Sequence, residues 1–190
     1  IRINATGTGG ENAFEVQRGS IVESTGTGAS AATITIIAVG GTDNGADIED
    51  ASILSVDGDI LIDGTGSQGV EVQESIISTT GAALVRIVGV GDDRDGIAID
   101  DTTINSVGTG TITLDGTTNG DDGVFINGLT TQIASVAGDI FITGATTGTG
   151  VGAHGVHIDS GITLVINATN AANITITGTG DAANEAVEID

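Results

Sequence analysis

The amino-acid sequence predicts an all-β fold: a parallel β-helix, or β-solenoid, with three short strands per coil and about seven coils of about 27 residues. Two observations favour this fold. Apolar couplets, meaning two apolar residues separated by one residue, recur along the whole chain. The segments between them are rich in Gly, Asn and Asp, which favour tight turns, and no long stretch has the apolar spacing of a helix.

Strand A is the first strand of each predicted coil, and its couplet is often followed by Gly-Thr-Gly or a near variant. Its residues are mainly Ile and Val, which favour strands. The seven predicted A couplets are Ile1/Ile3, Ile34/Ile36, Ile60/Ile62, Val85/Ile87, Ile112/Leu114, Ile140/Ile142 and Ile174/Ile176.

Strand B follows a Gly-rich bend after strand A, and its successive copies start 24 to 32 residues apart. The bend between A and B is the part of the repeat that varies most in length. The seven predicted B couplets are Phe14/Val16, Ala46/Ile48, Val70/Val72, Ile97/Ile99, Val124/Ile126, Val156/Ile158 and Val187/Ile189.

Strand C is shorter and lies between B and the next A. Its predicted anchors are Ile53, Ile77, Ile104 and Ile133, each followed two residues later by Ser or Thr. The pattern is less distinct in the first and sixth repeats, where we expect Ile21 and either Ile162 or Leu164 as anchors.

Apolar and polar residues alternate within each couplet, which is typical of a strand with one buried face. Short strands with frequent turns also occur in antiparallel β-sandwiches. We favour the solenoid because equivalent positions match at every third strand, which a sandwich does not require.

The repeats resemble the Gly/Thr/Asp-rich repeats of large bacterial surface proteins of the filamentous-haemagglutinin and adhesin type. The resemblance covers essentially the whole chain through "GDILIDGTG", "GTITLDGTT" and "GDIFITGATTGTG". It implies a right-handed parallel β-helix and an extracellular or cell-surface location. It identifies the architecture, whereas such repeats carry no catalytic signature.

Composition excludes several classes of function. The formal net charge is -22, with four basic residues, so the chain lacks the basic patch that nucleic acid or an anionic membrane surface requires. There is no Cys, which excludes disulfides and thiolate metal sites. No apolar run is long enough for a membrane helix, and we expect residues 1–190 to form a single domain.

The predicted repeat begins within an A strand and stops directly after a B couplet, without a polar capping repeat. An uncovered solenoid end exposes unpaired backbone. We therefore expect either a segment of a longer solenoid or subunits that stack end to end into a filament. The expected function is structural or adhesive, without enzymatic activity, catalytic residues or a required cofactor.

Calcium binding by the column of A-to-B bends is the main alternative. Clustered Asp side chains and loop carbonyls are the oxygen ligands that Ca²⁺ takes, and a glycan or host-surface ligand could occupy the same loops. Neither an EF-hand loop nor the tandem nonapeptide of calcium-binding β-rolls is present. The candidate Ca²⁺ ligands are Asp43, Asp47, Asp92, Asp93, Asp95, Asp121 and Asp122.

A polysaccharide hydrolase is a more remote alternative. "NGDDG" and "GAHGV" fall on consecutive coils and resemble the aspartate pair and Gly-His-Gly motif of polygalacturonases. By that resemblance Asp121, Asp122 and His154 would converge in one groove. However, Ala153 replaces the glycine before the histidine, no Arg or Lys follows Arg94, and no Trp or Tyr is present to stack on sugar rings.

Overall fold

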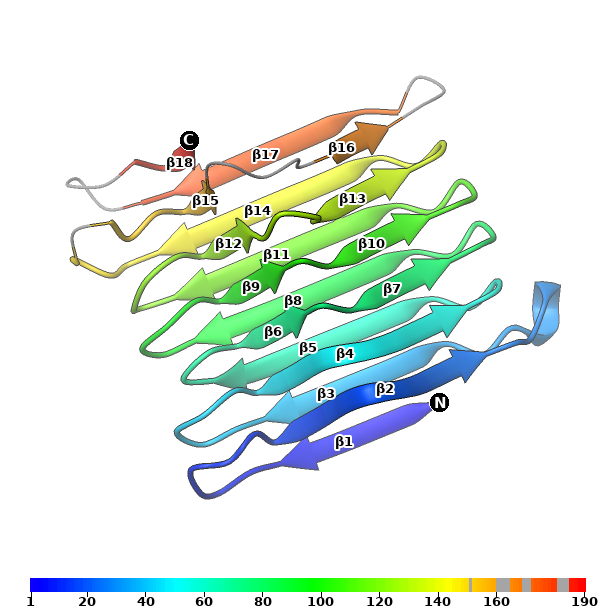
Figure 1. Ribbon diagram of the computed structural model, residues 1–190, viewed down its shortest axis with the longest axis horizontal. Helices are drawn as coiled ribbons and strands as arrows, with labels where there is room; N and C mark the ends of the chain where they lie inside the picture. Colours follow the sequence, from blue (N-terminus) through cyan, green and yellow to red (C-terminus); the bar gives the residue numbers. More distant parts are fainter. Residues whose placement is uncertain (151, 160–164, 169–171, 181–184) are drawn as a thin grey trace.

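The computed structural model describes residues 1–150, 152–159, 165–168, 172–180 and 185–190 as a stack of short strands (Figure 1). Every pair of neighbouring strands among these residues is parallel, and each strand pairs with its counterpart in the next coil. This confirms the parallel β-solenoid and excludes the antiparallel sandwich.

The A strands form one seven-stranded sheet. In order along the solenoid they are β1 (Arg2–Thr6), β3 (Ile34–Val39), β5 (Ile60–Gly66), β8 (Val85–Gly91), β11 (Ile112–Thr118), β14 (Ile140–Thr146) and β17 (Ile174–Thr179).

The B and C strands share a second sheet, because in the first two coils they run together as one long strand. These long strands are β2 (Phe14–Ser24) and β4 (Ala46–Ser55). The later B strands are β6 (Val70–Gln73), β9 (Ile97–Asp100), β12 (Val124–Asn127), β15 (Val156–Ile158) and β18 (Val187–Ile189). The later C strands are β7 (Ile76–Thr79), β10 (Thr103–Ser106), β13 (Gln132–Ser135) and β16 (Val165–Ala168).

The coil count is slightly lower than expected. The described residues contain seven A strands, seven B strands and six C strands, which makes about six complete turns. A short 3-10 helix, η1 (Gly28–Ser30), precedes β3. No helix among the described residues is long and apolar enough to cross a membrane.

The predicted couplets face the interior of the solenoid. The strand register matches them residue for residue; Ile36 pairs with Ile62 in the A column, and Ile99 pairs with Ile126 in the B column. In the central coils these side chains are fully buried and form continuous columns of Ile and Val. Burial of this apolar surface is the main favourable contribution to folding.

The expected anchor of the first C strand is wrong by one residue. Val22, and not Ile21, pairs with the buried Ile53, because the register shifts between Gln17 and Ser20, where the B-to-C corner holds an extra residue. Ile21 therefore points outward and is 64% exposed. In the sixth coil, Ile162 and Leu164 lie outside the described residues, and the residue of β16 that pairs with Ile133 is Ile166.

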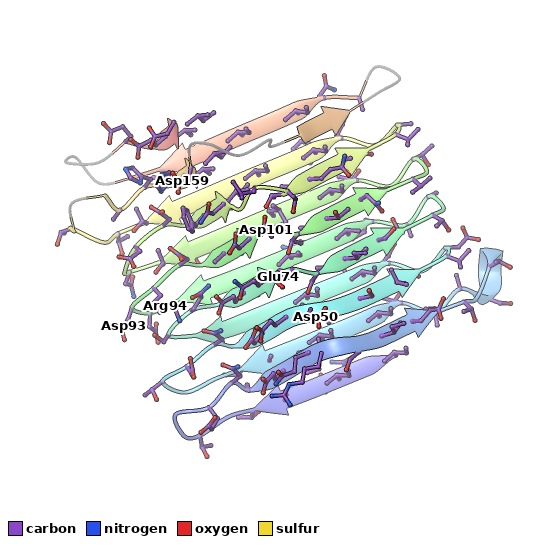
Figure 2. All side chains as sticks on the ribbon, viewed as in Figure 1. Asp50, Glu74, Asp93, Arg94, Asp101 and Asp159 are labelled. Carbon is purple, nitrogen blue, oxygen red and sulfur yellow. The ribbon has the colours of Figure 1, made fainter. Side chains whose placement is uncertain are left out.

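The B-to-C corner turns through backbone in the left-handed region. Asp50, Glu74 and Asp101 occupy successive coils at this corner, with φ of 45°, 49° and 45°, and they are labelled one above another in Figure 2. Asp tolerates this region better than most residues, and Gly128 takes the same conformation after β12. Directly beyond the corner the buried hydroxyls of Ser75 and Thr102 hydrogen-bond to backbone of the neighbouring coil.

The C-to-A corner is held by a column of buried hydroxyl side chains at the ends of the C strands. The Ser135 hydroxyl donates to the Gly110 carbonyl oxygen (3.2 Å) and accepts from the Gly138 amide (2.9 Å). The Thr79 hydroxyl donates instead within its own turn, to the carbonyl oxygen of Ala83 (3.1 Å). The members of the column, paired in register, are Ser24, Ser55, Thr79, Ser106 and Ser135.

Candidate functional site

The A-to-B corner is built from two facing columns of glycine. A Cβ on Gly89, near the end of β8, would lie 1.9 Å from the carbonyl oxygen of Gly96, and one on Gly69 would lie 2.3 Å from the amide nitrogen of Val90. In these coils the two backbones are too close for a side chain, which explains the first glycine after strand A; in β1 and β3 the equivalent residues are Ala5 and Ala38. One column is Gly64, Gly89, Gly116, Gly144 and Gly178; the other is Gly45, Gly69, Gly96, Gly123 and Gly155.

A polar side chain precedes each glycine of the second column, and we call these residues the bend ladder. Each of several members binds the backbone of the next coil. Asp95 Oδ1 accepts from the amide of Asp122 (3.0 Å), and Asp122 Oδ1 accepts from the amide of His154 (2.6 Å). Asn12 bonds in the same way to the amide of Asn44 (3.2 Å). The ladder consists of Asn44, Gln68, Asp95, Asp122 and His154, together with Asn12, which precedes Ala13 at the equivalent position of the first coil.

Gln68 departs from this pattern. Its side chain is fully buried, and neither Nε2 nor Oε1 has a hydrogen-bond partner among the described residues. A buried amide without partners costs about 1–3 kcal/mol relative to a satisfied one. The members of the bend ladder on either side of Gln68 therefore make side-chain hydrogen bonds, whereas Gln68 makes none among the described residues.

The seven Asp residues predicted as Ca²⁺ ligands lie in separate places. Asp92, Asp93 and Asp121 are exposed at the bend edge, where Figure 2 labels Asp93. Asp43 is partly exposed in an earlier bend, Asp47 is on the outward face of β4, and Asp95 and Asp122 belong to the bend ladder.

Asp122 differs from the other six predicted Asp residues in its distance to other candidate metal ligands. Among the described residues, three groups of His, Asp and Glu place one ligand atom each within 4.8 Å of one another. Asp122 belongs to one of these groups, and the other six predicted Asp residues belong to none. Calcium binding by the Asp residues stays a prediction.

Asp47 stands in a crowded acidic column on the outer face of the B strands. It pairs in register with Glu15 on one side and Glu71 on the other. Burial raises the pKa of Asp47 to about 6, with the charges of Glu71, Glu15 and Glu49 adding to the effect. The Asn12 side chain donates to Asp47 at 2.6 Å and opposes that shift.

Asp95 is a second carboxyl group with a raised pKa. Burial beneath the bend raises the pKa of Asp95 to about 6. The hydrogen bond from the Asp122 amide lowers it, and the charges of Asp122 and Asp121 raise it. Crowding of like charges is therefore concentrated beside the A-to-B corner.

Asp122 and His154, two of the three residues in the hydrolase hypothesis, are in contact. Asp122 Oδ1 lies 3.1 Å from His154 Nδ1, and both side chains are almost completely buried. Asp122 Oδ2 lies 2.9 Å from Nδ1 of His157. Glu188 Oε2 lies 2.8 Å from His154 Nε2 on the far side of that ring. The predicted Asp121 is exposed and outside this cluster.

Sequence reasoning missed His157 and Glu188. A signal for both was present, since each stands at the outward position inside a B couplet, between Val156 and Ile158 and between Val187 and Ile189. Equivalent positions of parallel strands in register are direct neighbours, and His157 does pair with Glu188. Aligning the outward residues of the couplets, as well as the apolar ones, would have found the contact.

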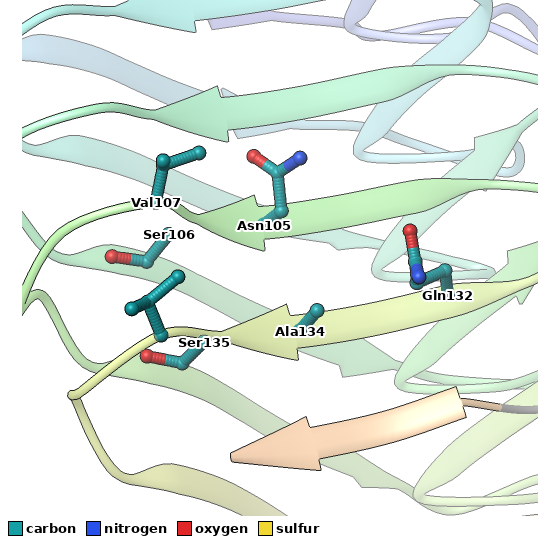
Figure 3. Close-up of a pocket in the computed structure, with 7 residues that line it drawn as sticks. Asn105, Ser106, Val107, Gln132, Ala134 and Ser135 are labelled. Atoms are coloured by element: carbon teal, nitrogen blue, oxygen red, sulfur yellow. The ribbon is translucent and has the colours of Figure 1, made fainter. Parts of the chain in front are cut away.

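A small hollow lies on the outer face of the C strands (Figure 3). It has a volume of about 190 Å³ and forms where the short Ala134 follows Asn105 in the outward column. Ligand pockets typically measure about 300–1,000 Å³. This hollow is too small to enclose a sugar chain.

No known protein family, curated protein or solved structure matches the chain.

Proposed function

We propose that the chain is a non-enzymatic structural or adhesive module of an extracellular bacterial surface fibre, sheath or adhesin. The observation that carries the proposal is the strand register, which continues through all three strand columns for about six turns. Neighbouring coils are joined by backbone hydrogen bonds and buried apolar columns, an arrangement that resists bending and stretching. The high net negative charge keeps such a rod soluble.

The apolar columns also support longitudinal packing. Ile1, Ile174 and Ile189 occupy inward positions in the outermost strands and are 48%, 42% and 63% exposed, whereas their counterparts in the central coils are buried. A further coil stacked on either face would cover these side chains. The proposal holds whether that coil belongs to the same chain or to another copy.

Electron microscopy of the native material tests this function. We expect fibres or long stalks in which the solenoid axis follows the fibre axis. Compact, isolated particles would contradict the proposal.

Stacking between copies is tested separately by sedimentation of the purified chain. Ile189→Glu places a charge on the end face, and Leu129→Glu is the control because Leu129 is exposed on the side of the solenoid. If copies stack, the first variant dissociates the assemblies and the second does not. Continuation within one chain predicts that neither variant changes the sedimentation.

Cation binding along the acidic B column is a second candidate. Glu15, Asp47 and Glu71 lie on adjacent strands, and the pKa of Asp47 is raised first by burial and then by the charges of Glu71 and Glu15. A Ca²⁺ ion relieves such repulsion and takes oxygen ligands of this kind. Calorimetric titration with Ca²⁺, and melting with and without a chelator, test it; no heat and no shift in melting temperature would dispose of it.

The hydrolase alternative gains no support from the site. Asp122 and His154 have nearly no exposed side-chain surface. A polysaccharide would have to displace the bend to reach them.

A further inference from the structure

Both histidines of the chain lie beside one buried carboxylate. Asp122 precedes β12, His154 precedes β15, and His157 lies within β15, so the three residues come from two consecutive coils. The ring centroids of the two histidines are 4.8 Å apart. The Asp122 carboxylate oxygens face one Nδ1 each, at 3.1 Å for His154 and 2.9 Å for His157.

His154 has a carboxylate at each of its ring nitrogens. Nδ1 faces Asp122, and Nε2 faces Glu188 at 2.8 Å, with Glu185 at 3.6 Å. A neutral imidazole donates from only one nitrogen, so one of these contacts would set a lone pair against a carboxylate. The arrangement is satisfied only when a cation, either a second proton or a metal ion, occupies one side of the ring.

His157 brings a second ring nitrogen to the same carboxylate. Its Nδ1 faces Asp122, whereas its buried Nε2 has no hydrogen-bond partner among the described residues. The nearest carboxylate oxygens to Nε2 belong to Glu188 at 3.8 Å and Asp190 at 4.0 Å, which is beyond hydrogen-bond distance. With Nδ1 bound to a metal ion, Nε2 would carry the ring proton and would have these two carboxylates within 4.0 Å.

We propose that Asp122, His154 and His157 form a binding site for a divalent transition-metal ion. The ligands are the Asp122 carboxylate and Nδ1 of both rings, and the Nε2–H of His154 donates to Glu188. Adjacent ligand atoms around a tetrahedral ion with bonds of about 2.05 Å lie about 3.3 Å apart. The separations of 3.1 Å and 2.9 Å are close to this value, and one ligand atom from each of the three residues lies within 4.8 Å of the other two.

The ligand set selects the class of metal. Two imidazole nitrogens and one carboxylate suit Zn²⁺ and its first-row neighbours, whereas Ca²⁺ takes six to eight oxygen ligands. The Glu188 contact is the carboxylate–histidine–metal arrangement that orients ligating histidines in known sites. Bound metal would tie the coil of β12 to the coil of β15 and, through Glu188, to β18.

The test uses the untagged chain after treatment with a chelator and buffer exchange. Zn²⁺ binding is measured by calorimetry, and Co²⁺ is added as a spectroscopic probe, both in a large excess of Ca²⁺. We expect one ion per chain and the visible absorption of four-coordinate Co²⁺. His157→Gln should weaken binding at least 100-fold, while Glu188→Gln, which changes only the orienting carboxylate, should weaken it by about 10–100-fold.

Glu23→Gln is the matched control, because Glu23 is an exposed glutamate on the outward face of β2, several coils away from His157. It should leave Zn²⁺ affinity within about threefold, as expected for a distant surface charge. Circular dichroism checks the fold of each variant; if His157→Gln does not fold, Glu188→Gln decides. No saturable Zn²⁺ binding by the parent chain, or equal weakening in the decisive variant and the Glu23→Gln control, would overturn the proposal.

Discussion

Two corners of the same coil are stabilised in different ways. At the A-to-B corner the chain closes through facing glycines, with a Cβ on Gly89 only 1.9 Å from the Gly96 carbonyl oxygen. At the C-to-A corner it closes through buried hydroxyls such as that of Ser135, which bonds to backbone of the turn and of the neighbouring coil. The A-to-B corner requires residues without a side chain, whereas the C-to-A corner requires polar side chains.

The difference accounts for the position of the proposed metal ligands and of the two carboxyl groups with raised pKa values. Glycine contacts set the position of the strands at the A-to-B corner, so the bend between them is free to vary in length and to carry Asp or His. At the C-to-A corner the side chain itself closes the turn. The Zn²⁺ ligands and the raised pKa values of Asp47 and Asp95 accordingly lie beside the A-to-B corner.

The largest effect is expected from Gly89→Ala. The added methyl group meets backbone atoms of Gly96, which directly precedes β9, and Ile97 of that strand is paired with both neighbouring coils, so this backbone is not free to move. We expect a loss of more than about 4 kcal/mol in the free energy of unfolding, beyond ordinary overpacking, or failure to fold. Urea denaturation followed by circular dichroism measures it.

Gly9→Ala is the control, because a Cβ there meets no atom within 4 Å. Its free energy of unfolding should stay within about 0.5 kcal/mol of the parent value. Similar stabilities for the two variants would show that the glycine columns are not required sterically.

The hydroxyl column allows a sharper comparison within one structural position. Ser135 and Ser106 pair in register and are both buried, yet the Ser106 hydroxyl has no hydrogen-bond partner among the described residues. Ser135→Ala leaves the Gly138 amide without its acceptor and should cost about 1–3 kcal/mol. Ser106→Ala should cost less than about 0.5 kcal/mol or increase stability, since no bond is lost. Equal losses in urea denaturation would mean that packing, and not hydrogen bonding, holds this corner.

The fold was predictable because its signal is repeated. A single couplet is compatible with several β folds, but apolar residues that match at every third strand are compatible with few folds other than a solenoid. The strand register agrees with the predicted couplets. Prediction failed where a coil departs from the average. At the first B-to-C corner one extra residue moves Val22 to the inward position and Ile21 to the surface, which a single coil's pattern does not reveal.

The candidate site was predictable only in part. Apolar alignment places Asp122 and His154 on neighbouring coils, and the structure brings them into contact. The alignment of apolar residues does not indicate which polar side chains are buried, so the exposed Asp121 and the buried Asp122 could not be distinguished from the sequence. Burial at the bend depends on the path of the backbone between two columns of glycine, which only three-dimensional packing determines.

The smallest expected effect is on the pH dependence of stability beside the A-to-B corner. Asp47 faces Glu15 from β2, Glu71 from β6 and Glu49 on its own strand, and its pKa in the folded state is raised to about 6 from 3.8. Between these values the folded state binds more protons than the unfolded state, so stability falls as pH rises through this window. The cost is fully present at pH 7. After discounting for solvent screening of a half-exposed group, it amounts to about 1 kcal/mol.

Asp47→Asn should remove this cost, because the amide is uncharged and its oxygen still accepts the hydrogen bond from Asn12. We expect the variant to be more stable than the parent at pH 7, with a difference that shrinks steadily toward pH 5, still above the isoelectric point of about 4.1. Asp63→Asn, an exposed carboxyl on the A sheet, is the control and should show a smaller change. A stability difference that stays constant from pH 7 to pH 5 would mean that repulsion within the acidic column does not act on Asp47, and that the charged corner is no more sensitive to pH than the hydroxyl corner.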